Sequence, residues 1–272
     1  MRSFLSCLVA TLTLAGSLNA AAPQIARFQS NLGNFEVLLW NEDLPVTCDN
    51  FIRYANSDAY VGTFLHRSFT NNTLDIQIIQ GGTYTIDLNE PVVEGPTTIP
   101  TFPPIALNAI FPNQRGTIAM ARTNDRDSAT SGWYFNLDDN VGLDFNYSVF
   151  GNVMGTGQNV IDAMGEVPTF NFGGAFTTFP LQNFIASPVL VTNFIFFQNI
   201  SVEAFAITSI TSSLEGVEIA WTPLSTNTPV RVERTTEVGG DPWTTLATGI
   251  VTGSYLDTAP PPGQAFYRVV AE

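Results

Sequence analysis

The chain contains no lysine and little charge of either sign. Its 272 residues include ten basic residues, all of them arginine, against 24 Asp and Glu, so the formal net charge is −14 and only 12% of residues are charged. Binding to nucleic acid or to anionic lipid needs stripes of basic side chains. The composition therefore predicts no nucleic-acid partner, and we interpret the acidic charge as favouring solubility.

Histidine and cysteine are equally scarce. His66 is the only histidine, and the two cysteines are Cys7 and Cys48. Metal sites need clustered His, Cys, Asp or Glu ligands, and the acidic stretch at 136–144 lacks the glycine spacing of an EF-hand loop. We therefore predict no metal and no cofactor. Cys48 is expected to be a small buried residue on a helix rather than a reactive thiol.

Long hydrophobic runs are absent except at the start of the chain. Residues 1–22, "MRSFLSCLVATLTLAGSLNAAA", combine one basic residue, a short apolar stretch and small residues, which is the layout of a secretory signal peptide. Cleavage after Ala20 and cleavage after Ala22 both fit. No later stretch approaches the roughly 20 apolar residues of a membrane span. The sequence predicts an exported protein, periplasmic or extracellular, with no membrane span.

Residues 23–204 are predicted to form one mainly β domain. Alternating apolar and polar residues at 25–40 indicate a hairpin, and helices are expected at 44–58 and 157–167. Short apolar runs separated by Asn-, Asp- and Gly-rich loops fill most of the remainder, up to a last strand at 189–202. Many strands with two helices favour a closed eight-stranded β-barrel capped by those helices.

The character of the sequence changes near residue 205. Residues 205–272 alternate apolar and polar positions between closely spaced turn signals and show no helix pattern. This stretch is predicted to be a second, all-β unit, most simply a small β-sandwich.

Several short motifs follow one another in a particular order along the first domain. They are "PVTCDNF" at 45–51, "HR" at 66–67, "QGG" at 80–82, "RGTIAMAR" at 115–122, "DSATSGWYF" at 127–135 and "LDFNYSVFGNV" at 143–153. In this order they resemble the cyclophilin family of peptidyl-prolyl cis–trans isomerases, in particular its bacterial exported members. The resemblance implies an isomerase that acts on X–Pro bonds of exported proteins, with proline-containing polypeptides as partners.

The resemblance assigns catalysis to Arg67 and Gln80. Rotation about an X–Pro bond is slow because amide resonance must be broken, and a hydrogen-bond donor at the prolyl nitrogen stabilises the twisted state selectively. A guanidinium suits this role because it stays charged and holds its donors rigidly. The alternative is that Arg67 is a core-edge residue paired with Asp75. We expect His66 to be a packed strand residue.

The same resemblance implies a set of substrate-binding residues. Ala121 lies on the strand that pairs with the substrate's main chain, Tyr134 and Leu143 form walls of the proline pocket, and Tyr147 stands where other members carry His or Tyr. With their neighbours, the expected substrate-binding residues are Phe69, Ile78, Met120, Ala121, Arg122, Tyr134, Leu143 and Tyr147.

The sequence also departs from the family's pattern. Thirteen positions separate Arg67 from Gln80, and counting back from Gln80 places Gln77 where the family has a pocket phenylalanine, so Phe69 or Ile78 must substitute. Gly132 replaces a glutamine. The altered pocket leaves a second hypothesis open: a non-catalytic protein that binds proline peptides or surfaces.

Two segments are longer than ordinary connections, at 83–114 and 168–188. We take them as surface elaboration, with recognition loops as the alternative.

The C-terminal unit resembles a fibronectin type III module. Trp221 stands on an early strand as a core residue, and Tyr267 lies in a strand that the resemblance places second to last. A full sandwich of this type has about seven strands, so the strand at 264–271 is expected to have an unpaired edge. Such an edge invites strand addition by the isomerase domain or by another protein.

Overall fold

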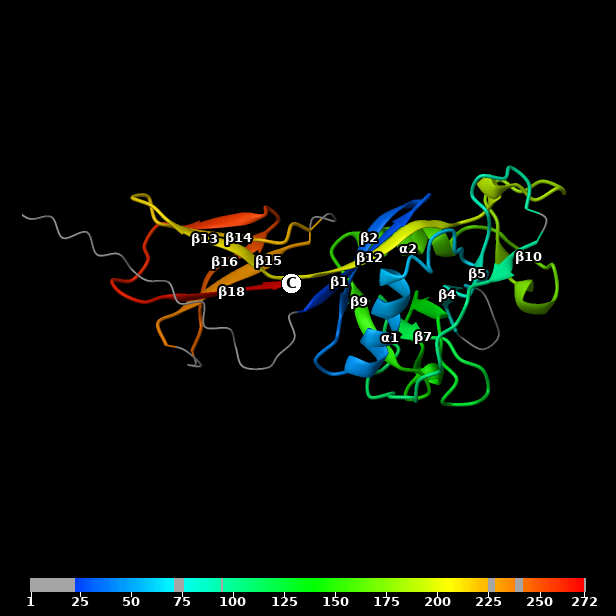
Figure 1. Cartoon of the computed structure of the whole chain (residues 1–272), viewed down its shortest axis with the longest axis horizontal. Helices are drawn as coiled ribbons and strands as arrows, with labels where there is room; N and C mark the ends of the chain where they lie inside the picture. Colours follow the sequence, from blue (N-terminus) through cyan, green and yellow to red (C-terminus); the bar gives the residue numbers. More distant parts are fainter. Residues whose placement is uncertain (1–22, 71–75, 94, 225–227, 238–241, 272) are drawn as a thin grey trace, which may run out of the picture. The chain divides into compact units, whose positions relative to one another are not determined.

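The computed structural model describes residues 23–70, 76–93, 95–224, 228–237 and 242–271. The predicted signal peptide at 1–22 lies outside these residues. Contacts along the backbone divide the chain into two compact units, with the boundary after Phe205. Figure 1 shows the course of the chain from the first unit, which holds both α-helices, to the second, which consists of strands.

An eight-stranded sheet forms the first unit. Its strands, in spatial order, are β12 (Phe197–Ala204), β1 (Gln24–Ser30), β2 (Gly33–Leu39), β9 (Val149–Val153), β7 (Thr117–Met120), β8 (Trp133–Asn136), β4 (Ile78–Gly81) and β3 (Arg67–Phe69). All pairings within it are antiparallel. The predicted hairpin is present, since β1 and β2 pair through their whole length.

The prediction of a closed barrel was wrong. The sheet curls into a half-barrel whose edge strands β3 and β12 do not pair with each other. The segment before β3 meets the start of β12 through the isolated bridge between Phe64 and Phe196 and a few backbone hydrogen bonds beside it, such as that from the Leu65 N–H to the Ile195 carbonyl over 2.9 Å. The reason is that β3 has only three residues and its outer edge is already engaged. The Ser68 N–H donates to the carbonyl of Thr178, 2.9 Å away, so the segment at 168–188 occupies the position that β12 would need.

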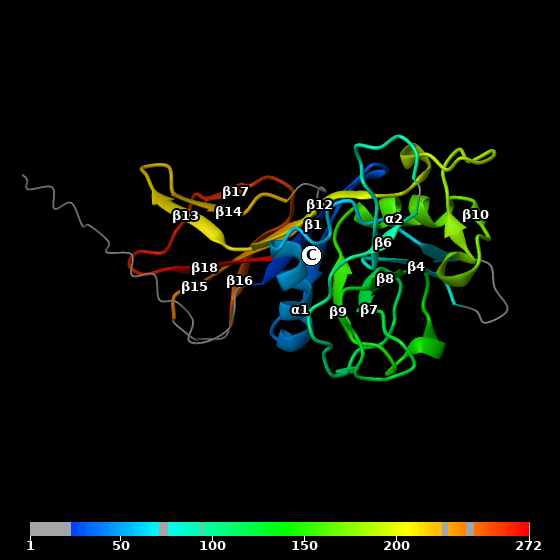
Figure 2. The same ribbon diagram turned by 45° about the vertical axis from the view of Figure 1, so that its right-hand side comes forward.

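Two helices cover the sheet, as predicted. Helix α1 (Pro45–Asn56) begins with proline, which is favourable in a first helical turn, and packs against β12, while α2 (Gly157–Gly165) packs against β2. Both helices contribute to the core that the curled sheet encloses, Phe51 from α1 and Ile161 from α2 among their residues. Figures 1 and 2 show the two helices beside the sheet.

Aromatic side chains fill the core beneath α1. Phe28 on β1 packs against Phe35, Phe51, Trp133 and Phe135, with ring centroids 4.8 to 6.0 Å apart. Cys48 lies in the same core and is fully buried, which confirms its prediction. Burial raises the pKa of its thiol to about 12, so it stays protonated and unreactive.

The "QGG" motif depends on Trp133. A side chain on Gly82 would place its Cβ only 2.4 Å from the Trp133 indole nitrogen, and the φ of Gly82 is +76°, a conformation that favours glycine. A Cβ on Gly81 would also be too close to the same ring, at 2.8 Å. The two glycines let the backbone cross over the indole directly after Gln80, and so they fix where β4 ends.

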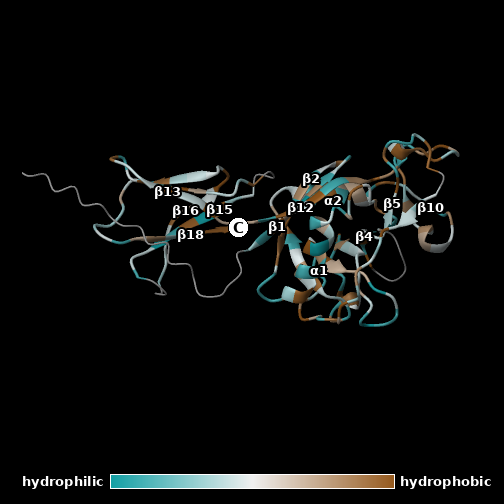
Figure 3. Cartoon of the chain, in the orientation of Figure 1, coloured by the Kyte–Doolittle hydropathy of each residue, from teal (hydrophilic) through white to brown (hydrophobic). Residues whose placement is uncertain are grey.

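A second hydrophobic core is built largely from the two long segments. Two short strand pairs belong to it: β5 (Tyr84–Thr85) with β6 (Thr97–Thr98), and β10 (Thr169–Phe170) with β11 (Phe179–Pro180). It also contains the short 3₁₀ helices Gly174–Phe176 and Val191–Asn193. A further 3₁₀ helix, Val141–Leu143, is not part of this core. Phe64, Phe179 and Phe194 pack at its centre, with Ile86 and Leu181 buried around them. Figure 3 shows hydrophobic stretches in the chain beside β5 and β10. Loops that were fully exposed to solvent would be expected to be polar instead.

The second unit contains two three-stranded antiparallel sheets. One has the order β13 (Ile207–Ser212), β14 (Val217–Trp221), β17 (Ser254–Asp257), and the other β16 (Thr244–Ile250), β15 (Val230–Thr235), β18 (Phe266–Ala271). Trp221 is buried, and the Tyr267 hydroxyl donates to Asp257 over 2.8 Å. The likeness to a fibronectin type III module remains a prediction.

We expect Gly82→Ala to lower the free energy of unfolding by about 1–3 kcal/mol, because it adds backbone strain and a clash with Trp133. Gly142→Ala is the matched control, since a Cβ there meets nothing within 4 Å. Urea unfolding of both variants beside the parent protein measures the difference. Equal stability of the two variants would contradict the role assigned to Gly82.

Candidate functional site

The pairing of β3 with β4 places Arg67 directly opposite Gln80. The two residues are thirteen positions apart in the sequence but are neighbours on paired strands. The Arg67 guanidinium stacks over the Phe69 ring, 4.3 Å from its centroid. Phe69 thus supports the arginine from one side and leaves the other side open.

The charge of Arg67 has no carboxylate partner among the residues that the structure describes. Asp75, the partner considered in the alternative prediction, lies outside those residues. Partial burial lowers the pKa of Arg67 from its usual value, with the nearby Tyr147 acting in the opposite direction. An arginine retains its proton at neutral pH despite such burial, so Arg67 presents a permanent positive charge.

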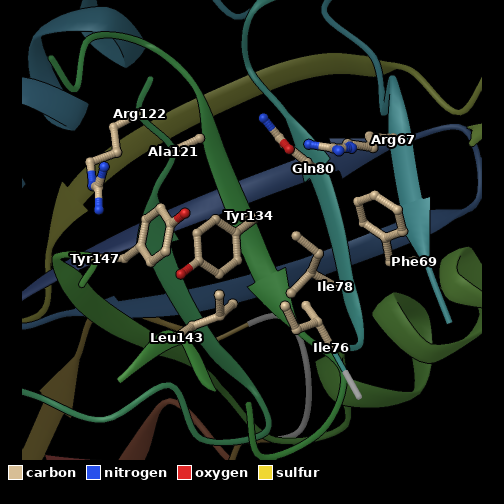
Figure 4. A pocket seen from close by; sticks show the side chains of 10 residues that line it. All are labelled: Arg67, Phe69, Ile76, Ile78, Gln80, Ala121, Arg122, Tyr134, Leu143 and Tyr147. Atoms are coloured by element: carbon tan, nitrogen blue, oxygen red, sulfur yellow. The ribbon is translucent and has the colours of Figure 1, made fainter. Parts of the chain in front are cut away.

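Arg67 and Gln80 border a hollow of about 220 Å³, on the face of the sheet opposite to the aromatic main core around Phe28. Figure 4 shows the side chains around it, which come from β3, β4 and β8 and from the loops that follow β7 and precede β9. The hollow is lined by Arg67, Phe69, Ile76, Ile78, Gln80, Ala121, Arg122, Tyr134, Leu143 and Tyr147.

Tyr134 lies near the centre of this hollow and is held rigidly. Its hydroxyl donates to the Oδ1 atom of Asn113 over 2.6 Å, and Asn113 in turn donates from Nδ2 to the carbonyl of Leu143 over 2.9 Å. Burial raises the pKa of Tyr134 well above its usual value, so it remains neutral. Tyr147 meets its ring edge to face at 5.5 Å. The hollow is thus an apolar, aromatic pocket with a guanidinium at its rim.

The structure brings nearly all of the predicted site residues to this one hollow. Met120 is the exception, and its prediction as a substrate-binding residue is corrected. Its side chain is 1% exposed and belongs to the main core, because alternation along β7 turns it away from the hollow, on the opposite face from Ala119 and Ala121.

Two residues at the site were missed. Ile76 lines the hollow, and the alternation of Ile76 with Ile78 around the polar Gln77 was the available signal. Gln77 itself points away and donates to Asp138. Asn113 positions Tyr134, but no sequence pattern links the two residues, because Asn113 lies in a loop 21 residues before Tyr134.

His66 is a packed residue of the second core's border. It is 4% exposed and contacts Tyr84 edge to face, with ring centroids 4.9 Å apart. Burial, and to a lesser extent the charge of Arg67, lower its pKa to about 4. It is therefore neutral at physiological pH.

Among the described residues, no group of three or more His, Cys, Asp or Glu side chains could hold a metal ion. No helix in the same part of the chain is long and apolar enough to cross a membrane.

Fold and site together define a curled antiparallel sheet with an apolar pocket beside an arginine. Comparison with known proteins identifies the family. Residues 25–186 match the family model described as cyclophilin type peptidyl-prolyl cis-trans isomerase. The chain belongs to this family, and it is a cyclophilin-type peptidyl-prolyl cis–trans isomerase by homology.

Curated bacterial proteins show the same relationship. The chain is 36% identical over 162 residues to a peptidyl-prolyl cis-trans isomerase of Acinetobacter baylyi, a match that covers 58% of this chain and 80% of the relative. It is 35% identical over 189 residues to peptidyl-prolyl cis-trans isomerase A of Dickeya dadantii, covering 64% and 89%. A crystal structure of a cyclophilin type isomerase from Cryptosporidium parvum aligns with 67% of this chain and 98% of its own, at 18% identity and a TM-score of 0.47.

We expect His66 to make the protein less stable in weak acid. Below about pH 6.5 the unfolded chain takes up a proton that the folded protein, with a His66 pKa of about 4, does not. The free energy of unfolding therefore falls as the pH drops from 6.5 towards 4, by about 2 kcal/mol between pH 7 and pH 5. Urea unfolding across this range measures the fall.

His66→Phe is the comparison variant, because it keeps an aromatic ring beside Tyr84 and removes the only histidine titration. Between pH 7 and pH 5, the free energy of unfolding of His66→Phe should fall by about 2 kcal/mol less than that of the parent protein. The same fall in both proteins would assign the effect to carboxylates.

Proposed function

We propose that Arg67 catalyses rotation of X–Pro bonds by stabilising the twisted amide. A proline ring in the hollow rests against Tyr134, Leu143 and Ile78. The Arg67 guanidinium, stacked on Phe69, then lies at the rim where the prolyl nitrogen would stand. A donor at that nitrogen stabilises the twisted state more than either planar state, since twisting localises the lone pair there.

The remaining contribution comes from holding the substrate's main chain. Gln80 lies opposite Arg67 on β4, and Ala121 follows β7 on the other side of the hollow. We propose that these residues hold the backbone on either side of the proline, so that the ring stays fixed while the preceding peptide group turns. No nucleophile, metal or cofactor is needed for this reaction.

The energetic demand is moderate. Shortening a reaction of tens of seconds to milliseconds requires the barrier to fall by about 5–7 kcal/mol. One charge-assisted hydrogen bond in a pocket that excludes water supplies part of this, and fixation of the substrate supplies the rest. The single observation that carries the proposal is the Arg67 charge, which has no carboxylate partner in the described part of the chain and lies at the rim of an apolar, proline-sized hollow.

We further propose that the substrates are exported proteins. Support comes from the composition of residues 1–22, which has the layout of a signal peptide, and from the acidic, lysine-free composition of the chain. The protein would then act in the periplasm or outside the cell, and the second unit would serve as an accessory fibronectin type III-like module.

We expect Arg67→Ala to reduce kcat/KM for a short X–Pro peptide by about 10²–10³-fold, the loss typical of removing one transition-state donor. A protease-coupled or NMR exchange assay measures the rate. Arg53→Ala is the matched control, because Arg53 also stacks on an aromatic ring, that of Phe102 at 4.1 Å, but lies on α1 away from the hollow. Activity that survives Arg67→Ala would exclude the mechanism.

For the second unit, we propose that the outer edge of β18 accepts an extended polypeptide segment. β18 pairs with β15 on one side, and no described strand pairs with its other side. Outward amides of β18 should therefore exchange quickly in the isolated protein and slowly with a bound partner, as measured by hydrogen–deuterium exchange. Fast exchange along all of β18 in the presence of every exported client tested would contradict this proposal.

A further inference from the structure

The long segment at 168–188 is unusually apolar for a connection between strands. It contains five of the chain's 21 phenylalanines, and the stretch at 167–202 contains no charged residue. Such connections normally run over the surface. Part of the apolar content builds the second core, in which Phe179 and Leu181 are buried. The apolar side chains that remain outside this core need another explanation.

Four of them reach the surface close together and are here called the insert patch: Phe170, Phe172, Phe184 and Ile185. The Phe184 ring contacts the rings of Phe170 and Phe172, with centroids 5.0 and 5.8 Å apart. Phe172 is 48% exposed, and Ile185, which follows Phe184 in the chain, is 96% exposed. Contiguous apolar patches on a protein surface mark sites of interaction.

Hydrogen bonds hold the insert patch in a fixed shape. β10 pairs with β11 beneath it, and the Phe172 N–H donates to the Phe176 carbonyl over 2.9 Å. The Gln182 N–H donates to the Asn193 carbonyl over 2.7 Å, and Nδ2 of Asn193 donates back to the Gln182 carbonyl over 2.8 Å. A surface that is already ordered loses little conformational entropy when a partner binds.

The size and the charge of the insert patch indicate the kind of partner. From the exposed fractions of its side chains, it offers roughly 300–400 Å² of apolar area. A stable dimer buries about 800 Å² on each partner, so the patch is too small to hold a second copy of the chain. Anionic membranes attract basic residues, and neither long segment, at 83–114 or at 168–188, contains one. A short, extended, apolar stretch of another polypeptide fits both properties.

The insert patch is also continuous with the site beside Arg67. The Ser68 N–H, directly after Arg67, donates to the Thr178 carbonyl over 2.9 Å. The ring of the next residue, Phe179, lies 6.0 Å from the Phe172 ring. These steps place the patch at most about 25 Å from Arg67, a distance that about eight residues of an extended chain cover. One polypeptide can therefore reach both places.

We propose that the insert patch binds an apolar segment of an unfolded client polypeptide, about eight residues along the chain from the proline that is isomerised. This inference rests on the proposed function, because it takes the hollow beside Arg67 as the place where the proline binds. Folded proteins bury most of their large apolar side chains, whereas unfolded chains expose them. The patch thus directs the isomerase to chains whose X–Pro bonds still limit their folding.

The test compares two peptides of 20 residues, each with a single Ala-Pro bond. One carries Leu-Phe-Leu-Phe eight residues from the proline, and the other carries Ser-Gly-Ser-Gly there; both are made with this segment before and after the proline. We expect kcat/KM for the apolar peptide to be about tenfold higher in one of the two orders, because a second contact on the same chain forms at a high effective concentration. A ratio of one or below in both orders overturns the proposal.

Substitutions in the insert patch assign the effect. Ile185→Ser and Phe172→Ser should each bring the ratio of the two peptides closer to one, whereas Phe172→Leu, which keeps an apolar side chain, should retain it. Because Ile185 is almost fully exposed, its substitution leaves the core intact and keeps the test decisive if Phe172→Ser fails to fold.

Leu214→Ser is the matched control. It removes an equally exposed apolar side chain from the turn between β13 and β14, in the second unit, and should leave the ratio unchanged. The parent ratio in both Ile185→Ser and Phe172→Ser, or an equal loss in Leu214→Ser, overturns the proposal.

A binding measurement separates the insert patch from the proposed catalysis. Fluorescence anisotropy of the two labelled peptides reports affinity without turnover. Tighter binding of the apolar peptide that Ile185→Ser abolishes, with no isomerisation of either peptide, would support the patch and exclude the catalytic mechanism. Isomerisation of both peptides at equal kcat/KM, lost in Arg67→Ala, would support the mechanism and exclude the patch. A dimer in light scattering that Ile185→Ser dissociates would assign the patch to a second copy and overturn the proposal.

Discussion

The register between β3 and β4 is the constraint on which the site depends. It sets Arg67 across from Gln80 on neighbouring strands, although the two residues are thirteen positions apart in the sequence. A shift by one residue would turn Arg67 to the other face of the sheet and would remove both the stack on Phe69 and the charge at the rim of the hollow. The register is held at the end of β4, where Gly81 and Gly82 cross the Trp133 indole and allow no larger residue. A core tryptophan thus helps to determine where Arg67 lies.

The two long segments, at 83–114 and 168–188, cover the part of the half-barrel that strand pairing would close in a complete barrel. A closed barrel would remove the free edges of β3 and β12 by pairing them. Here the edge of β3 is instead hydrogen-bonded to Thr178, and the aromatic second core around Phe64 packs beside it. The insertions therefore have a structural role first. That role also brings the Gly174–Phe176 turn next to Arg67 and Gln80, with which its residues Gly174 and Ala175 line one hollow.

Much of the fold and most of the site could be predicted from the sequence, for identifiable reasons. Alternation along 25–40 and the apolar spacing of α1 are local signals, and the ordered motifs placed Arg67, Gln80, Ala121 and Tyr134 together without any knowledge of distances. Barrel closure could not be predicted, because it depends on which backbone groups already have partners at the edge of β3. Met120 was misplaced because a motif marks a strand, whereas the face that each residue takes follows from alternation along it. Asn113 could not be found because only the fold brings it to the Tyr134 hydroxyl.

Because positive charge is scarce in this chain, the position of each arginine is informative. Most arginines of the described chain form ion pairs, as Arg27, Arg115 and Arg234 do. Arg67 and Arg122 stack on aromatic rings instead, at two sides of the hollow. Stacking holds a guanidinium in place and leaves its outward N–H groups unneutralised, which an ion pair would not. In a chain of net charge −14, the long-range field is negative, and only charges close to the site can act against it within the Debye length of about 8–10 Å. Positive potential at the site therefore has to be local, and these two arginines supply it.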